Sequence, residues 1–142
     1  MLLQLRIENL ATIRELDVEF TAGFSILTGE TGAGKSIMID AILLVLGHRG
    51  DPGIIRTGEE HALVEGIFSI PANSDQGEQF NIRRELEYSG ITLDDELIVR
   101  CLVSRKGRQK RHINGVSVTA DFLKKIGRQL INIHGQHDNQ SL

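Results

Sequence analysis

The chain has 142 residues, of which 40% are hydrophobic and 25% charged, a balance typical of one soluble globular domain with a sizeable core. The formal net charge of -3 excludes a generally basic coat for nucleic acid and leaves room for a local basic patch. The single cysteine, Cys101, cannot form an internal disulfide, and the longest apolar run, residues 41–46, is far shorter than the roughly 20 residues that span a bilayer. Arg6 and Glu8 interrupt any signal-peptide core, so we expect a cytoplasmic protein without a membrane segment.

The first third of the chain predicts strands that lead into a helix. Alternating apolar residues predict a strand over residues 2–8, and a second strand fits residues 16–20. After a turn, the apolar stretch FSILT at 24–28 predicts a buried strand. No Gly or Pro interrupts residues 35–46, and Gly47 follows as a stop signal, so these residues predict a helix. The helix is apolar on nearly all sides, which favours burial against a sheet.

The remainder of the chain predicts an irregular connection followed by an antiparallel meander. Residues 47–58 contain four glycines and one proline and predict an irregular segment. The following predicted elements are a strand at 62–70, a loop at 71–77, a short helix at 78–88 and a strand at 96–104. Residues 105–108 turn the chain back into QKRHI, and Asn114-Gly115 favours a tight type I′ turn, which gives a three-stranded meander.

The C-terminal segment predicts a helix and then a strand. Thr119 is placed to cap a helix that runs to about residue 126, and QLINI, at 129–133, predicts another buried strand. The sequence contains no repeat and no interdomain linker, so we expect residues 1–142 to form a single domain.

One motif carries chemistry. GETGAGKS, residues 29–36, meets the phosphate-loop pattern G-x-x-x-x-G-K-[ST] between a predicted strand and a predicted helix, a pattern that arises by chance in about half a percent of chains this long. Its glycines let backbone N–H groups approach phosphate oxygens, Lys35 would neutralise the β and γ phosphates, and the Ser36 hydroxyl would bind Mg²⁺. The alternative is a glycine-rich turn that only caps a core helix. The predicted phosphate-loop residues are Gly29, Glu30, Thr31, Gly32, Ala33, Gly34, Lys35 and Ser36.

The other parts of a phosphate-loop enzyme are not evident. Such an enzyme needs an apolar strand that ends in an acidic residue for Mg²⁺, and a group that positions the attacking water. Glu65 is followed by more predicted strand, and Asp40 lies within the motif's own helix. The residues therefore indicate half of an ATPase.

Five segments, in order, resemble a known family. LQLRIENLATIRELDVEF, ILTGETGAGKSIMIDAILLVLG, IIRTG, HINGVSV and LINIHGQHDNQSL resemble the N-terminal head segment of the RecN family of bacterial DNA repair proteins, within the structural-maintenance-of-chromosomes (SMC) group of ABC-type ATPases. This resemblance implies an α/β fold, a P-loop half-domain of the ABC/SMC-head type with a mixed sheet around the P-loop helix and an antiparallel β meander. It also implies that a coiled coil begins after residue 142.

The resemblance further implies cofactors, partners and site residues. The cofactors are ATP and Mg²⁺, and the partners are the C-terminal half of the same head and a second head in an ATP-dependent dimer. Gln136 would be the Q-loop glutamine that reaches the metal and the attacking water, so Lys35 and Gln136 are the implied catalytic residues; a surface amide is the alternative for Gln136. Ile37, which replaces a hydroxyl residue of related loops, is also counted among the cofactor-binding residues, and Arg56 would either reach the nucleotide or serve only the structure.

Residues 105–111, RKGRQKR, hold five of the 16 Lys and Arg residues. Such a cationic hairpin suits sequence-independent contact with the phosphates of double-stranded DNA, since no aromatic residue interleaves for single-strand stacking. The alternative is a solvated tip that only keeps the edge strands from aggregating. The predicted contact residues are Lys106, Arg108, Lys110 and Arg111.

Three functions remain open, and the first of them follows from the resemblance. The leading one is the ATP-binding half of a nucleoid-associated repair ATPase acting on double-strand breaks, which hydrolyses ATP only with its C-terminal half and a second head. The alternatives are a self-sufficient small P-loop kinase or nucleotidase, and a non-enzymatic DNA-binding β module. His112, His134, His137 and Cys101 match no zinc pattern, and Cys101 is expected to be inert core.

Overall fold

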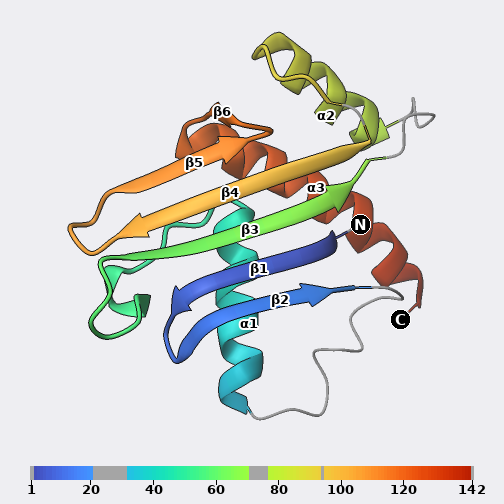
Figure 1. The fold of residues 1–142 in the computed structure, drawn as a ribbon. Helices are drawn as coiled ribbons and strands as arrows, with labels where there is room; N and C mark the ends of the chain where they lie inside the picture. The colour runs from blue at the N-terminus through green and yellow to red at the C-terminus, as the bar shows by residue number, and fades with distance from the viewer. Residues whose placement is uncertain (1, 21–31, 71–76, 94, 142) are drawn as a thin grey trace.

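The computed structural model describes residues 2–20, 32–70, 77–93 and 95–141. Its centre is one six-stranded antiparallel sheet with the strand order β2-β1-β3-β4-β5-β6, and α1 and α3 lie behind it in Figure 1. The strands are β1 (Leu2–Leu10), β2 (Ile13–Glu19), β3 (His61–Ser69), β4 (Glu96–Ser104), β5 (Gln109–Ile113) and β6 (Val116–Ser117). The helices are α1 (Gly32–Val45), the short 3-10 helix η2 (Pro52–Ile54), α2 (Gly77–Tyr88) and α3 (Ala120–Ser141).

The sheet has one apolar face and one mixed face because side chains alternate along each strand. In β4 the residues Leu97, Val99, Cys101 and Val103 are buried, whereas the residues between them are exposed or half-buried. Strand β3 pairs with β4 and shows the same alternation. We call the buried side the inner face and the other side the open face.

The predicted meander is confirmed. Strand β4 has the predicted bounds, and β5 and β6 follow as antiparallel partners. The turn between β5 and β6 is Asn114-Gly115, with φ angles of 48° and 83°, and positive φ at both central residues is the requirement of a type I′ turn. Asn114 also accepts a hydrogen bond from the Ile98 backbone N–H through its side-chain oxygen, at 2.7 Å.

The helix expected at 35–46 is α1, which crosses the inner face and begins three residues earlier. Ala41, Leu44 and Val45 of α1 are buried in the core cluster. Its C-terminal end meets α3 at two glycines. A Cβ at Gly127 would collide with the Leu46 carbonyl oxygen, and a Cβ at Gly47, where φ is +99°, would lie 2.5 Å from the Lys124 backbone.

The strand predicted at 129–133 is wrong, because α3 continues through these residues. Thr119 caps α3 as predicted, its hydroxyl oxygen accepting a hydrogen bond from the Phe122 N–H at 3.1 Å. Leu123, Ile126 and Leu130 are buried with helical spacing, so the apolar period of three to four residues runs into QLINI. A short apolar run is compatible with either element, and here the helix extends.

The α/β fold class is confirmed, and all six described strands pair antiparallel. The strand predicted at 24–28, which would make the sheet mixed, lies outside the described residues. None of the described helices combines the length and apolar character needed to cross a membrane.

The contact at Gly127 leads to a stability prediction. We expect Gly127→Ala to lower the free energy of unfolding by about 1 to 3 kcal/mol, because the collision with the Leu46 backbone outweighs the roughly 1 kcal/mol that alanine adds to a helix. Urea unfolding followed by circular dichroism measures the change. Gly53→Ala is the control, since its Cβ would meet only Asp51 at ordinary contact distance. Equal stability of wild type and Gly127→Ala would contradict the close packing.

Candidate nucleotide-binding site

The phosphate-loop pattern runs into the first turn of α1. Gly29, Glu30 and Thr31 lie outside the described residues, and the backbone of residues 32–35 begins the helix. The first four backbone N–H groups of an α-helix have no partner within the helix, and the helix dipole adds partial positive charge at the same end. A helix that begins inside the motif therefore presents donors suited to a phosphate group. Figure 1 shows this end of α1 beyond the β2 edge of the sheet.

The next two residues of α1 face in different directions. Ser36 is exposed, so its hydroxyl is accessible to a ligand, whereas the side chain of Ile37 is buried in the core. Mg²⁺ favours oxygen ligands and usually keeps several waters, so an exposed hydroxyl at a helix N-terminus fits its needs. Across the residues that the structure describes, no group of three or more His, Cys, Asp or Glu could hold a metal ion.

Arg56 lies beside the end of β1. Its backbone N–H donates to the Asn9 carbonyl at 2.9 Å, and its own carbonyl accepts from the Arg105 guanidinium at 3.0 Å. The adjacent residues, Ile55 and Leu10, form an isolated bridge. The half-buried Arg56 is thus held next to the β1–β2 turn, and its contact with nucleotide stays a prediction.

Gln136 lies in α3, and its side chain is outside the described set. The helix that carries it is connected to the end of α1 through the Gly127 contact with Leu46. This packing relates the helix of Gln136 to the phosphate-loop helix, while the role of the glutamine stays a prediction.

Comparison with known proteins identifies the family. Residues 4–142 match the family model of the AAA domain. The chain belongs to the AAA domain family. Over its whole length it is 46% identical to the DNA repair protein RecN of Bacillus subtilis, of which it covers 24%. It spans about a quarter of the length of the curated relatives that it matches.

Solved structures show where the fold of this AAA domain recurs. A structure of an SMC ATPase, described for ATP-driven dimerisation and DNA-stimulated activation, has a TM-score of 0.67 at 22% identity and is matched over 90% of this chain and 78% of that one. The Smc head domain with an extended coiled coil from Pyrococcus furiosus has a TM-score of 0.66 at 23% identity, over 90% of this chain and 32% of that one. These likenesses confirm the fold of an ATPase head, and the family implies nucleotide binding.

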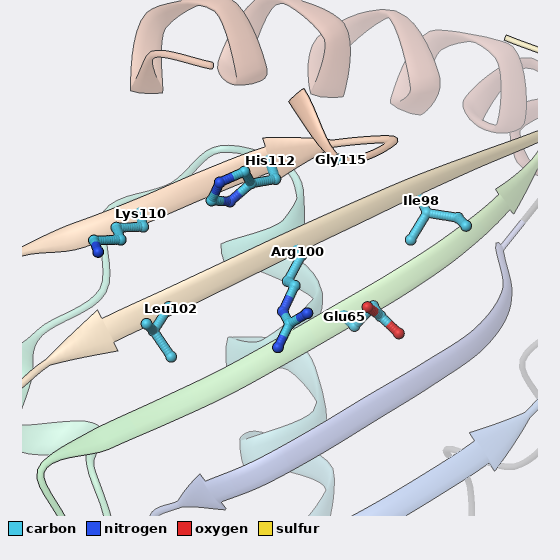
Figure 2. Close-up of a pocket in the computed structure, with 7 residues that line it drawn as sticks. All are labelled: Glu65, Ile98, Arg100, Leu102, Lys110, His112 and Gly115. Atoms are coloured by element: carbon cyan, nitrogen blue, oxygen red, sulfur yellow. The ribbon is translucent and has the colours of Figure 1, made fainter. Parts of the chain in front are cut away.

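The cations predicted to contact DNA divide between the two faces of the AAA domain's sheet. Lys106, Arg108 and Lys110 line one hollow on the open face. Arg111 lies opposite Cys101 on the inner side, and its guanidinium donates to the Gln109 side-chain oxygen at 2.6 Å. Arg100, which the predicted set did not include, lies on the same open face opposite His112 of β5 and lines an adjoining hollow (Figure 2).

Cys101 confirms the prediction of an inert core thiol. It is buried, and its Sγ donates to the Leu44 carbonyl at 3.2 Å, which connects β4 to the last turn of α1. Burial raises the pKa of Cys101 to about 11, and the positive charge of Arg111 opposes that rise only in part. A thiol with such a pKa is protonated at neutral pH and is a poor nucleophile.

The raised pKa predicts that high pH weakens the fold. The unfolded chain loses the Cys101 proton at a lower pH than the native protein, so this thiol's contribution to stability is full below pH 9 and falls as pH rises towards 11. We expect a loss of about 1 kcal/mol at pH 10 from this group. Urea unfolding of wild type and Cys101→Ala at pH 8 and pH 10 isolates the contribution of Cys101 to the free energy of unfolding, because the other titrating groups are common to both proteins. The same change in the free energy of unfolding between pH 8 and pH 10 in both proteins would refute the raised pKa of Cys101.

Proposed function

We propose that this chain is the ATP-binding N-terminal half of a RecN-like ATPase head. The observation that carries the proposal is the phosphate-loop pattern that enters the first turn of α1 in a chain of the AAA domain family. The accessible Ser36 adds a hydroxyl at the same helix end. The match to RecN proteins over the whole length of this chain, at 46% and 40% identity, supports this choice against a self-sufficient kinase or an isolated β module.

Each site residue then has a chemical task. The backbone N–H groups from Gly29 through Ser36 bind phosphate oxygens, and Lys35 neutralises charge on the β and γ phosphates. Ser36 and Gln136 would hold Mg²⁺, which would neutralise negative charge on the transferred phosphoryl group. Arg56 approaches the nucleotide from the loop that follows α1.

Hydrolysis requires surfaces that this chain does not supply alone. Ile39 and Leu43, 44% and 37% exposed, leave apolar area on the side of α1 away from the sheet, which the C-terminal half of the head would cover. The chain spans 24% of the RecN of Bacillus subtilis, so the acidic metal-binding and water-activating groups belong to the remainder. A coiled coil after residue 142 joins the halves, and two heads enclose ATP between them.

The names of the relatives suggest the process. RecN proteins are called DNA repair proteins, and we assign this chain to the same process, the repair of DNA double-strand breaks in the bacterial cytoplasm at the nucleoid. ATP binding would control whether two heads associate.

The first test of this function is nucleotide affinity. We expect Lys35→Ala to weaken Mg-ATP binding about 10- to 100-fold, because charge-assisted hydrogen bonds to phosphate contribute roughly 1.5 to 3 kcal/mol. Isothermal titration with ATP and MgCl₂ measures the change. Lys124→Ala, which removes an exposed lysine on α3, is the matched control. Unchanged affinity in Lys35→Ala would exclude the phosphate-loop site.

The second test concerns turnover. The isolated chain should bind ATP yet release phosphate no faster than a Lys35→Ala variant, since the groups that activate water lie elsewhere. Addition of the separately expressed C-terminal half should raise the rate at least tenfold, measured by phosphate release with ATP in excess. Rapid turnover by the isolated chain would show that its site is complete.

A further inference from the structure

The segment between η2 and β3 contains a tight turn whose first residue is Arg56. The Glu59 backbone N–H donates to the Arg56 carbonyl at 3.0 Å, which closes a four-residue turn over residues 56–59. Gly58, the third residue of this turn, has a φ of +89°, and positive φ at that position is the requirement of a type II turn. We call residues 56–59 the Arg56 turn. Its conformation depends on a glycine at position 58, because other residues adopt positive φ only with strain.

The side chain of Arg105 holds both ends of the Arg56 turn. Its Nε donates to the Glu59 carbonyl at 2.9 Å, and its Nη2 donates to the Arg56 carbonyl at 3.0 Å. The backbone N–H of Arg105 also donates to the carbonyl of the next residue, Glu60, at 2.9 Å. The guanidinium group carries its donors in a fixed planar fork, which suits two acceptors a short distance apart. Figure 1 shows the β4–β5 turn and the start of β3 at the same end of the sheet.

The contacts of Arg105 differ from those of the cations that follow it. Lys106, Arg108 and Lys110 line a hollow on the open face, and Arg105 is not part of that lining. The β4–β5 turn is closed by backbone hydrogen bonds, from Ser104 N–H to the Arg108 carbonyl at 2.7 Å and from Gly107 N–H to the Ser104 carbonyl at 2.9 Å. The guanidinium of Arg105 therefore supports the Arg56 turn and not the turn in which it lies.

The backbone of Arg56 is fixed on both sides. Its N–H donates to the Asn9 carbonyl at the end of β1, at 2.9 Å, and its carbonyl accepts from Glu59 and from Arg105. Hydrogen bonds from a charged donor are shorter and stronger than those between neutral groups, so the guanidinium adds more than a backbone contact would. A residue whose N–H and carbonyl are both held directs its side chain into a narrow range of directions.

We propose that Arg105 is a positioning residue, which holds the Arg56 turn so that the Arg56 side chain meets the bound nucleotide. The consequence rests on the proposed nucleotide contact of Arg56, whereas the choice of Arg105 rests on the hydrogen bonds of its guanidinium. When a binding-competent conformation is populated only part of the time, the apparent affinity falls by that fraction. Without the guanidinium the turn keeps three backbone hydrogen bonds, donated by Arg56, Glu59 and Arg105, so it opens part of the time and does not unfold.

The first test is a double-mutant cycle on Mg-ATP affinity, measured by isothermal titration of the whole chain. We expect Arg105→Ala to weaken binding about three- to tenfold through loss of charge-assisted hydrogen bonds, and Arg56→Ala to weaken it at least as much. In the Arg56→Ala background, Arg105→Ala should cause no further loss, because it acts only through Arg56. Arg84→Ala, which removes an exposed arginine of α2, is the control and should keep the wild-type affinity.

A glycine substitution loosens the same turn without changing Arg105. A Cβ at Gly58 would meet nothing within 4 Å, so Gly58→Ala acts through the positive φ alone. It should weaken Mg-ATP binding severalfold in the wild type and leave it unchanged in the Arg56→Ala background. Gly90→Ala is the matched control, because Gly90 has a φ of +77° and equally open surroundings after the end of α2. It should strain the backbone to a similar degree and keep the affinity.

Hydrogen exchange measured by NMR tests the structural step alone. In Arg105→Ala the Glu59 amide, which closes the Arg56 turn, should exchange severalfold faster than in the wild type. The Gly107 amide, which closes the β4–β5 turn, should keep its rate. Equal acceleration of both amides would assign the Arg105 side chain to the hairpin and overturn the proposal.

The remaining outcomes distinguish this inference from the proposed function. Unchanged affinity in Arg105→Ala, or losses from Arg105→Ala and Arg56→Ala that simply add, would show that Arg105 does not act through Arg56. Equal losses for Gly58→Ala and Gly90→Ala would indicate general destabilisation and would also overturn the inference. If Lys35→Ala weakens ATP binding and Arg56→Ala does not, the phosphate-loop site stands and the positioning role of Arg105 is wrong.

Discussion

Packing of α1 against the inner face of the sheet is the interaction on which the rest of the domain depends. Ala41, Leu44 and Val45 bury their side chains on that face, and each buried aliphatic side chain of valine or leucine size contributes roughly 1.5 to 3 kcal/mol. Gly66 of β3 allows the approach, since a Cβ there would lie 3.2 Å from a Val45 methyl group. Because the helix is fixed to the sheet along its middle and end, its first turn is held beyond the β2 edge, where the phosphate-loop pattern enters.

The C-terminal end of α1 is braced by contacts from distant parts of the chain. Gly47 and Gly127 let α3 approach at backbone distance, and the Gln109 amide exchanges hydrogen bonds with the backbone of Gly50, at 2.7 and 3.3 Å. Arg105 donates to the carbonyls of Glu59 and Arg56, which ties the following loop to the β4–β5 turn. These contacts join segments 40 or more residues apart, so the irregular connection after α1 is positioned by tertiary contacts and not by local propensity.

Sequence patterns predicted those elements whose local signals and tertiary environment agree. Strand β4 alternates strictly and is bounded by turn residues, and Asn114-Gly115 adopts the positive φ angles that its turn type requires. The segment 129–133 was assigned wrongly because five apolar-rich residues fit a strand or a helix. Only the burial of Leu130 in the core, at helical spacing from Leu123 and Ile126, decides between them. For the candidate site, the motif located the start of α1. The hydrogen bond from the Arg105 guanidinium to the Arg56 carbonyl joins residues far apart in the sequence, so no local pattern could predict it.

The alternation of side chains that builds the core also decides which face of the sheet each charged residue lies on. Counting cations along residues 105–111 places Lys110 and Arg111 together, yet adjacent residues of a strand project to opposite sides, and Arg111 is bonded to Gln109 on the inner side. Across the open face, Arg6 of β1 is paired with Glu8 at 3.1 Å and Glu15 at 4.0 Å, and Gln4 donates to Asp17 of β2. The β1–β2 side therefore has internal partners for its cation and an acidic edge, whereas Arg100, Lys106, Arg108 and Lys110 on the β4–β5 side form no ion pair within 4.0 Å in the described part of the chain. The register of the strands therefore separates paired from unpaired cations along one face of the sheet.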